Sequence, residues 1–158
     1  MTEERAGAWT RTSRVITARS EELYAAFLDP TALVDWLPPA EMTGEIHEFD
    51  ARVGGGYRMS LFYPPDERAF RGKTSDREDM VNVRFVELAP PRRIVAAVSF
   101  VTADPAFFGE MTMIATFEEV SGGTAVTLVC KNPPPGLRAE DNEAGSRLSL
   151  EQLARRFE

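Results

Sequence analysis

Residues 139–158 read AEDNEAGSRLSLEQLARRFE, and this final stretch decides the fold. Leu150, Leu153, Ala154 and Phe157 follow one another at helical spacing, which predicts a long amphipathic helix. Such a helix must bury its apolar stripe against other parts of the chain. Because the preceding residues are mainly strand-like, we expect the helix to pack on the concave face of a bent antiparallel sheet.

Seven segments ahead of this helix have the length of strands and are separated by Gly, Pro or Asp. They cover residues 11–18, 42–49, 57–63, 80–88, 93–101, 110–120 and 124–131. Ser20 is expected to cap a short helix, and Asp29-Pro30 separates that helix from a second one at residues 31–37. The predicted fold class is α+β, a curved seven-stranded antiparallel sheet with two short helices after strand 1 and a long C-terminal helix.

Length and composition are those of one globular domain. The chain has 158 residues, 43% of them hydrophobic, which predicts a single domain at residues 10–158 behind a flexible N-terminal segment at 1–9. The net charge of -7 argues against a nucleic-acid partner, and no apolar run reaches the length of a membrane span. The charged N-terminus lacks a secretory signal, and one cysteine cannot form an intramolecular disulfide, so a cytoplasmic location is expected.

The stretch GEIHEFDARVGGGYRMSL, at residues 44–61, contains the only histidine and a triple glycine. By strict alternation His47 shares a strand face with Glu45, whereas Glu48 points to the other side, so these groups cannot share a metal. The glycines lack the Lys-Ser/Thr ending of a phosphate-binding loop and lead into a strand, which predicts a bend in the sheet. We therefore expect no metal and no cofactor.

Catalytic signals are sparse. The polar stretch GKTSDRED holds Asp76, Glu78 and Asp79, which are typical of solvated charges. No motif places a histidine beside any of the serines considered as nucleophiles, and His47 has no predicted acid-base partner. These serines are Ser60, Ser75, Ser99 and Ser121. An enzyme nevertheless stays open as an alternative, with Tyr57, Arg58, Arg84 and Glu110 as candidates by position.

Five segments together resemble one superfamily. SEELYAAFLDPTALVDWLPP, FDARVGGGYRMSL, RFVELAPPRRIV, GEMTMIATFEEVSGGTAVTL and EDNEAGSRLSLEQLA are similar, in order, to START-like (SRPBCC, Bet v-type) proteins. Within that superfamily they most resemble bacterial stand-alone proteins related to the C-terminal domain of the 90-kDa heat-shock-chaperone ATPase activator. The resemblance implies a helix-grip fold with a cavity between the sheet and the last helix. Ser146 departs from it, since many relatives have Trp there.

Alternation on the strands points apolar and soft side chains toward this expected cavity. The predicted ligand-binding residues are Trp36, Tyr57, Met59, Leu61, Phe85, Val98, Phe100, Met113, Cys130, Ser146 and Leu148. A mostly apolar pocket is the usual small-molecule site, although the same side chains could simply fill a core.

The leading functional hypothesis is non-catalytic binding of a small hydrophobic or amphipathic molecule between the sheet and the C-terminal helix. Two alternatives come from the resemblance. One is an enzyme of the polyketide cyclase or dehydratase type, and the other is a module that activates a chaperone ATPase or acts in a stress response. A homodimer is also left open.

Overall fold

The computed structural model describes residues 9–64, 74 and 78–158. The expected flexible segment lies, apart from Trp9, outside these described residues, as do Ser75 and Asp76 of the polar stretch. In chain order the elements are β1 Thr10–Ile16, α1 Ser20–Phe27, α2 Pro30–Trp36, β2 Thr43–Phe49, β3 Gly56–Phe62, β4 Glu78–Ala89, β5 Arg93–Phe100, a 3-10 turn at Pro105–Phe107, β6 Glu110–Val120, β7 Gly123–Lys131 and α3 Ala139–Phe157.

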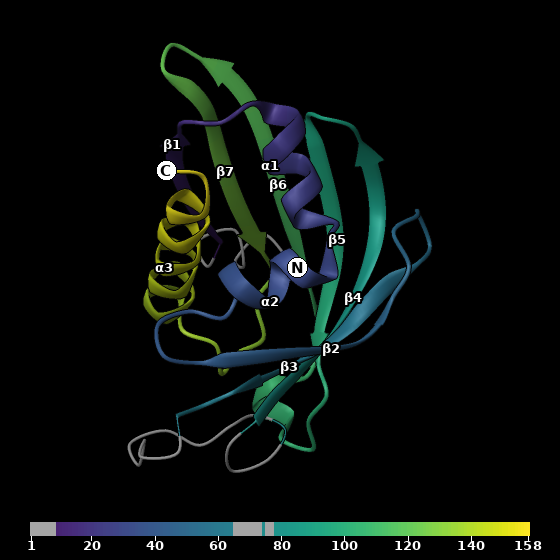
Figure 1. The fold of residues 1–158 in the computed structure, drawn as a ribbon. Helices are drawn as coiled ribbons and strands as arrows, with labels where there is room; N and C mark the ends of the chain where they lie inside the picture. Colours follow the sequence, from purple (N-terminus) through teal and green to yellow (C-terminus); the bar gives the residue numbers. More distant parts are fainter. Residues whose placement is uncertain (1–8, 65–73, 75–77) are drawn as a thin grey trace.

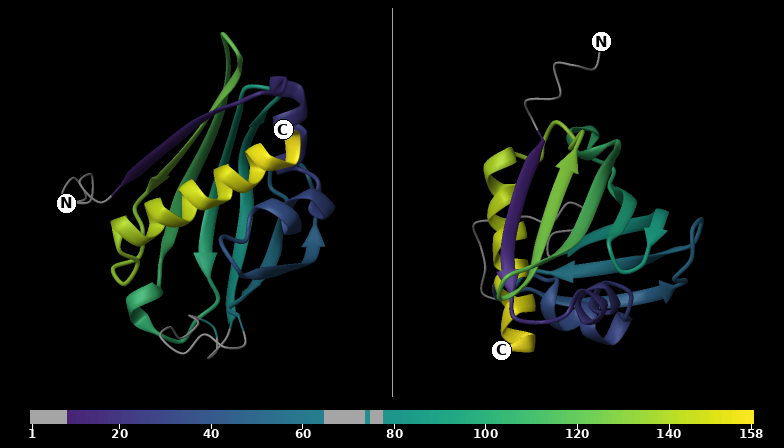
Figure 2. Two further views of the ribbon diagram at one scale, coloured as in Figure 1. Left: turned by 60° about the vertical axis from the view of Figure 1, so that its left-hand side comes forward. Right: turned by 90° about the horizontal axis from the view of Figure 1, so that it is seen from above.

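The seven strands form one antiparallel sheet in the order β1-β7-β6-β5-β4-β3-β2. Consecutive strands from β2 to β7 are neighbours, while β1 closes the far edge against β7. The sheet curls, and all three helices lie on its concave face (Figures 1 and 2). The α+β helix-grip architecture predicted from the sequence is therefore confirmed.

Helix α3 crosses the concave face beside β1, as Figure 2 shows. Its buried side includes Leu150, Leu153 and Ala154, each at most 1% exposed, and this is the stripe that the helical spacing predicted. Acidic residues lie in its first turn and Arg155 and Arg156 in its last, which suits the helix dipole.

The start of α1 differs from the expectation. Arg19, not Ser20, is the N-cap residue, and its backbone N–H donates to the Glu22 carboxylate over 3.1 Å. Ser20 is buried in the first turn, where its hydroxyl donates to Glu119 of β6 over 3.2 Å. The serine thus connects α1 to the sheet and does not cap the helix.

A bulge in β2 overturns the alternation assumed around His47. Ile46 pairs with Met59 and Glu48 pairs with Arg58, so His47 is the extra residue. Both His47 and Glu48 are exposed as a result, contrary to the expectation that they face opposite sides. Phe49 instead turns inward and stacks on Tyr57, with ring centroids 5.2 Å apart.

The triple glycine forms the predicted bend between β2 and β3. Gly54 adopts a left-handed backbone with φ of 88°. At Gly56 a Cβ atom would lie 1.8 Å from the Val83 carbonyl oxygen, so the close approach of β4 excludes any side chain there. Gly55 is needed for the same steric reason, since its Cβ would meet the Asp50 carbonyl oxygen at 2.6 Å.

Candidate functional site

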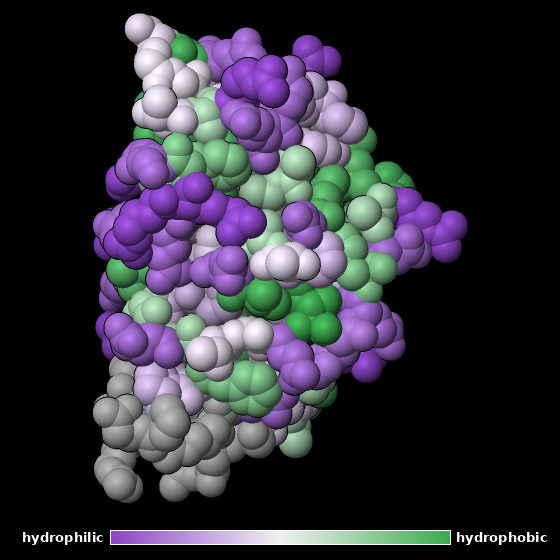
Figure 3. All heavy atoms as spheres, in the orientation of Figure 1, coloured by the Kyte–Doolittle hydropathy of each residue, from purple (hydrophilic) through white to green (hydrophobic). Residues whose placement is uncertain are grey.

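An apolar cavity of about 80 Å³ lies between the concave face of the sheet and helices α1 and α2. Phe27, Leu33, Trp36 and Leu37 form its helical side. The sheet contributes Tyr57, Val83, Phe85, Ile94, Ala96, Val98, Met113, Ala115 and Leu128. Beyond α1 and α2, where no helix covers β4 and β5, hydrophobic side chains reach the molecular surface (Figure 3).

The side chains that line this cavity are almost all hydrophobic. The indole of Trp36 is 1% exposed and packs on Phe27 with ring centroids 4.7 Å apart. Its N–H is already used, donating to the Ala26 carbonyl over 3.0 Å. Tyr57 brings the one hydroxyl among the lining residues. It is protonated at neutral pH and can donate a hydrogen bond, and burial raises its pKa further above neutrality.

Helix α2 is fixed over the cavity from both of its ends. At its start Asp29 accepts a hydrogen bond from the Thr31 backbone over 3.0 Å. At its end, Gln152 of α3 donates to the carbonyl of Trp36, the last helical residue, and to that of Pro38, each over 2.8 Å. Ser149 also donates to the Leu37 carbonyl over 2.6 Å. Helix α3 therefore contributes to the cavity by holding its cover in place.

The cavity includes some of the residues predicted from the sequence and not others. Trp36, Tyr57, Phe85, Val98 and Met113 line it. Met59 and Cys130 are buried, whereas Leu61 and Phe100 are half-buried, and all four lie outside the lining.

The two predicted residues on α3 also lie outside it. Ser146 is half-buried, and Leu148 is 37% exposed because it lies on the far side of the helix from Leu150 and Leu153. Sequence reasoning missed the contribution of α1 and α2 apart from Trp36. The helical spacing of Leu23, Ala26 and Phe27 was the available signal.

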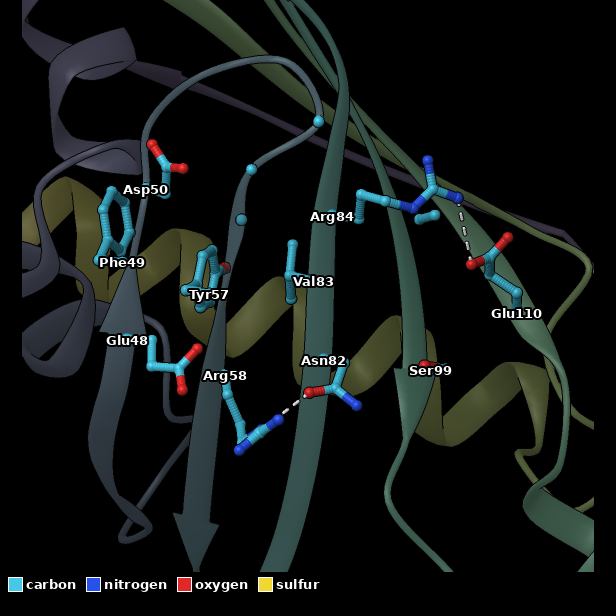
Figure 4. A pocket seen from close by; sticks show the side chains of 14 residues that line it. Glu48, Phe49, Asp50, Tyr57, Arg58, Asn82, Val83, Arg84, Ser99 and Glu110 are labelled. Carbon is cyan, nitrogen blue, oxygen red and sulfur yellow. Dashed lines mark hydrogen bonds and ion pairs between the residues drawn. The ribbon is translucent and has the colours of Figure 1, made fainter.

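A larger, polar groove of about 500 Å³ lies on the outer face of β2 to β6 and at the glycine bend (Figure 4). Arg84 forms an ion pair with Glu110 at 3.3 Å, and Arg58 donates to the Asn82 side chain over 3.0 Å. Helix α3 is visible behind these strands in Figure 4, so the three charged candidates for catalysis face away from the cavity. Only Tyr57, which borders both hollows, could act within it.

A hydrogen-bond chain joins the only histidine to a serine and a carboxylate on the outer face. Nε2 of His47 lies 2.8 Å from Oγ of Ser60, which donates to Glu78 over 2.5 Å. His47 thus has a polar partner, contrary to the expectation from the sequence. Ser60 is completely buried and lies between the other two, so it is closed to a substrate and the order differs from that of a nucleophilic triad.

Comparison with known proteins identifies the family. Residues 17–158 match the family model described as "Activator of Hsp90 ATPase homolog 1-like protein". The chain belongs to this family. A comparison with curated proteins gave no match.

Solved structures share the fold of this family member. CV1439 from Chromobacterium violaceum is 32% identical, with a TM-score of 0.84 over 96% of this chain and 97% of that one. Ms6760 from Mycobacterium smegmatis is 17% identical, with a TM-score of 0.75 over 98% and 93%. DynU16, described as a protein in the dynemicin biosynthetic locus, is 20% identical, with a TM-score of 0.67 over 94% of this chain and 46% of that one.

The helices of the described residues were also compared with the requirements of a membrane span. None of their helices combines the length and apolar character that crossing a bilayer requires.

Proposed function

We propose that the protein binds a small hydrophobic molecule in the cavity between the sheet and helices α1 and α2. The observation that carries this proposal is an apolar lining with four aromatic side chains and a single hydroxyl, beneath a cover fixed by hydrogen bonds. An apolar space of this kind favours an uncharged ligand, because an ion would lose its hydration without gaining a partner.

Size narrows the ligand further. The cavity of about 80 Å³ is smaller than the roughly 300–1,000 Å³ of sites for drug-sized molecules. It is also smaller than the engineered cavity of about 150 Å³ that binds benzene. A single ring is therefore the expected ligand body, and its entry needs a small outward shift of flexible side chains such as Met113.

A fluorescence titration with p-xylene tests the proposal. The chain has two tryptophans, so Trp9→Phe leaves Trp36 of the cavity as the only reporter. We expect saturable quenching or a spectral shift on addition of p-xylene. The absence of any saturable change, together with an unchanged melting temperature, would contradict the proposal.

A matched pair of variants locates the binding site. Ala96 and Ala97 are neighbours on β5, and they line the inner cavity and the outer groove respectively. Ala96→Leu should fill the cavity and weaken p-xylene binding at least tenfold, whereas Ala97→Leu should change it less than twofold. The reverse pattern would place the ligand in the outer groove.

The enzymatic alternative ranks second on a specific ground. A cyclase-type reaction needs a proton donor and a proton acceptor near one substrate. Within the cavity lining Tyr57 can donate, but Arg58, Arg84 and Glu110 lie on the other face of the sheet. The cavity therefore supports orientation of a carbonyl better than proton shuttling.

The hypothesis that the protein activates a chaperone ATPase is supported only by the name of its family, and it needs a separate experiment. We expect no stimulation of an Hsp-type ATPase by the purified chain at micromolar concentration. Saturable stimulation that surface charge reversals abolish would reverse the order of these proposals.

A further inference from the structure

A small polar cluster lies between the first turns of α3 and the edge of the sheet formed by β1 and β7. Thr10 pairs with Cys130 across the two strands, and both are buried. Thr12 pairs with Leu128 one step further along. The Asn142 side chain of α3 reaches this edge, where it and Thr10 partly offset the burial that raises the pKa of the Cys130 thiol.

Two atoms of this cluster are buried without a hydrogen bond. Oγ1 of Thr12 and Nδ2 of Asn142 are closed to solvent and make no hydrogen bond of regular geometry within the described residues, and Nδ2 has the weakly accepting sulfur of Cys130 beside it. Folded proteins satisfy nearly all buried polar groups, because an unpaired one has lost its bond to water and gained nothing. Two such atoms on facing elements indicate a place where a hydrogen-bonding group of another molecule fits.

The cluster begins directly behind one wall of the apolar cavity. Met113 and Leu128 both line the cavity. Met113 pairs with Cys130 on the neighbouring strand and its sulfur contacts the Cys130 thiol, while Leu128 pairs with Thr12. An unbranched methionine changes rotamer easily, so a shift of Met113 extends the cavity toward this cluster.

We infer that the ligand is an uncharged amphipathic molecule, whose apolar body fills the cavity and whose hydroxyl or carbonyl head binds Asn142 and Thr12 under α3. This inference rests on the proposed function and adds the chemical class of the ligand. The polar groups that meet the head are a hydroxyl and an amide, so they suit a neutral head and offer no counter-ion to a charged one.

The test uses 4-phenyl-1-butanol and n-pentylbenzene, which have the same shape and differ by a terminal OH or CH₃. The double variant Thr12→Val, Asn142→Leu replaces both unpaired groups by apolar ones of similar size. Isothermal titration gives the affinity of each probe for wild type and variant. We expect the ratio of alcohol to hydrocarbon affinity to fall about tenfold in the variant, the effect of one lost hydrogen-bonding site.

Thr124→Val is the matched control. Its hydroxyl is also buried, on β7, but it already donates to the Ala18 carbonyl over 2.7 Å. This control should lose stability and keep the wild-type affinity ratio. The double variant should melt no lower than wild type, because it removes groups that are unpaired in the empty protein.

Cys130 gives a second readout, since it is the only cysteine and is 1% exposed. Bound 4-phenyl-1-butanol should slow its reaction with a thiol reagent several-fold in wild type, and less in the double variant. Binding of both probes with an affinity ratio that the double variant leaves unchanged would overturn the inference and leave the proposed function standing. Failure of both probes to bind wild type would overturn the inference, and the p-xylene titration then shows whether the proposed function stands without it.

Discussion

Strands β3 to β6 have a hollow on each face, and the two hollows differ in almost every property that matters for binding. The inner one is about 80 Å³, apolar and covered by two helices. The outer one is about 500 Å³, polar and open. In the outer groove Arg84 is bound to Glu110 and Arg58 to Asn82, so these polar groups already satisfy one another.

This comparison shows that volume alone does not say which hollow favours an apolar molecule. A ligand in the outer groove must compete with existing ion pairs and with water, and exposed pairs contribute little energy to begin with. A ligand in the inner cavity replaces empty space by contacts with aromatic and aliphatic side chains. The smaller hollow is thus the more favourable one for an apolar molecule.

The largest difference between the two faces should appear when neighbouring residues of β4 are truncated. Phe85 is 3% exposed and lines the cavity, so Phe85→Ala should destabilise the fold by about 3–5 kcal/mol. Arg84 is 55% exposed in its side chain, so Arg84→Ala should cost less than about 1 kcal/mol. Urea unfolding of both variants measures these effects. Similar losses would mean that the outer groove contributes as much to stability as the core.

A smaller effect is expected from the contacts that hold the cover of the inner hollow. Gln152→Ala removes the two hydrogen bonds from α3 to Trp36, the last residue of α2, and to Pro38, which should cost about 1–2 kcal/mol and speed the release of p-xylene. Arg147→Ala, at an exposed position of the same helix, is the control. Stopped-flow fluorescence of Trp36 measures the release rate. An unchanged rate in Gln152→Ala would show that the ligand leaves by a path that does not move α2.

Tyr57 borders both hollows, and the pH dependence of stability shows whether its hydroxyl is buried on the inner side or solvated on the outer side. Burial raises the pKa of its hydroxyl, so the folded protein keeps this proton at a pH where the unfolded chain loses it. The stability that this pKa difference gives the folded state is therefore complete below about pH 10, and it declines as the pH rises further.

Tyr57→Phe should remove that contribution. Between pH 10 and 11 its stability should fall less steeply than that of wild type, by up to about 1.4 kcal/mol per pH unit. Chemical unfolding at several pH values measures both slopes. Parallel curves would indicate a hydroxyl that is solvated on the outer side.

The smallest effect is expected on the outer face at His47. Because Ser60 donates to Glu78, its oxygen accepts from His47, and a glutamine amide can donate in the same way. His47→Gln should change stability by less than about 1 kcal/mol and leave p-xylene binding unchanged. Loss of binding in this variant would move the site to the outer face.

The sheet and the long helix could be predicted because they follow from regular spacing. Alternation along β5 and β6 gave the inward-facing residues correctly for Val98 and Met113, and the helical stripe gave Leu150 and Leu153. Turn residues between the strands indicated hairpins, and so an antiparallel sheet. Strand alternation and helical spacing are local patterns, and each extends over many consecutive residues, so they can be recognised in the sequence.

The features that failed depend on single residues or on contacts distant in sequence. Alternation cannot reveal the bulge at His47, which places Glu48 on the outer face and Phe49 inside. The resemblance implied that the short helix with Trp36 closes the cavity, but no pattern connects Gln152 with Pro38, so the hydrogen bonds that hold this cover were not predicted. Helix α3 was expected to line a cavity that it only supports. Three-dimensional packing alone decides these points.

The most direct test of the central claim is a crystal structure with 4-bromotoluene, which resembles p-xylene and has bromine in place of one methyl group. The anomalous signal of bromine marks where the molecule binds. Our account predicts one peak inside the cavity, beside Trp36 and Met113, and none between Arg58 and Arg84. A peak only in the outer groove, or an inner cavity closed by repacked side chains, would contradict it.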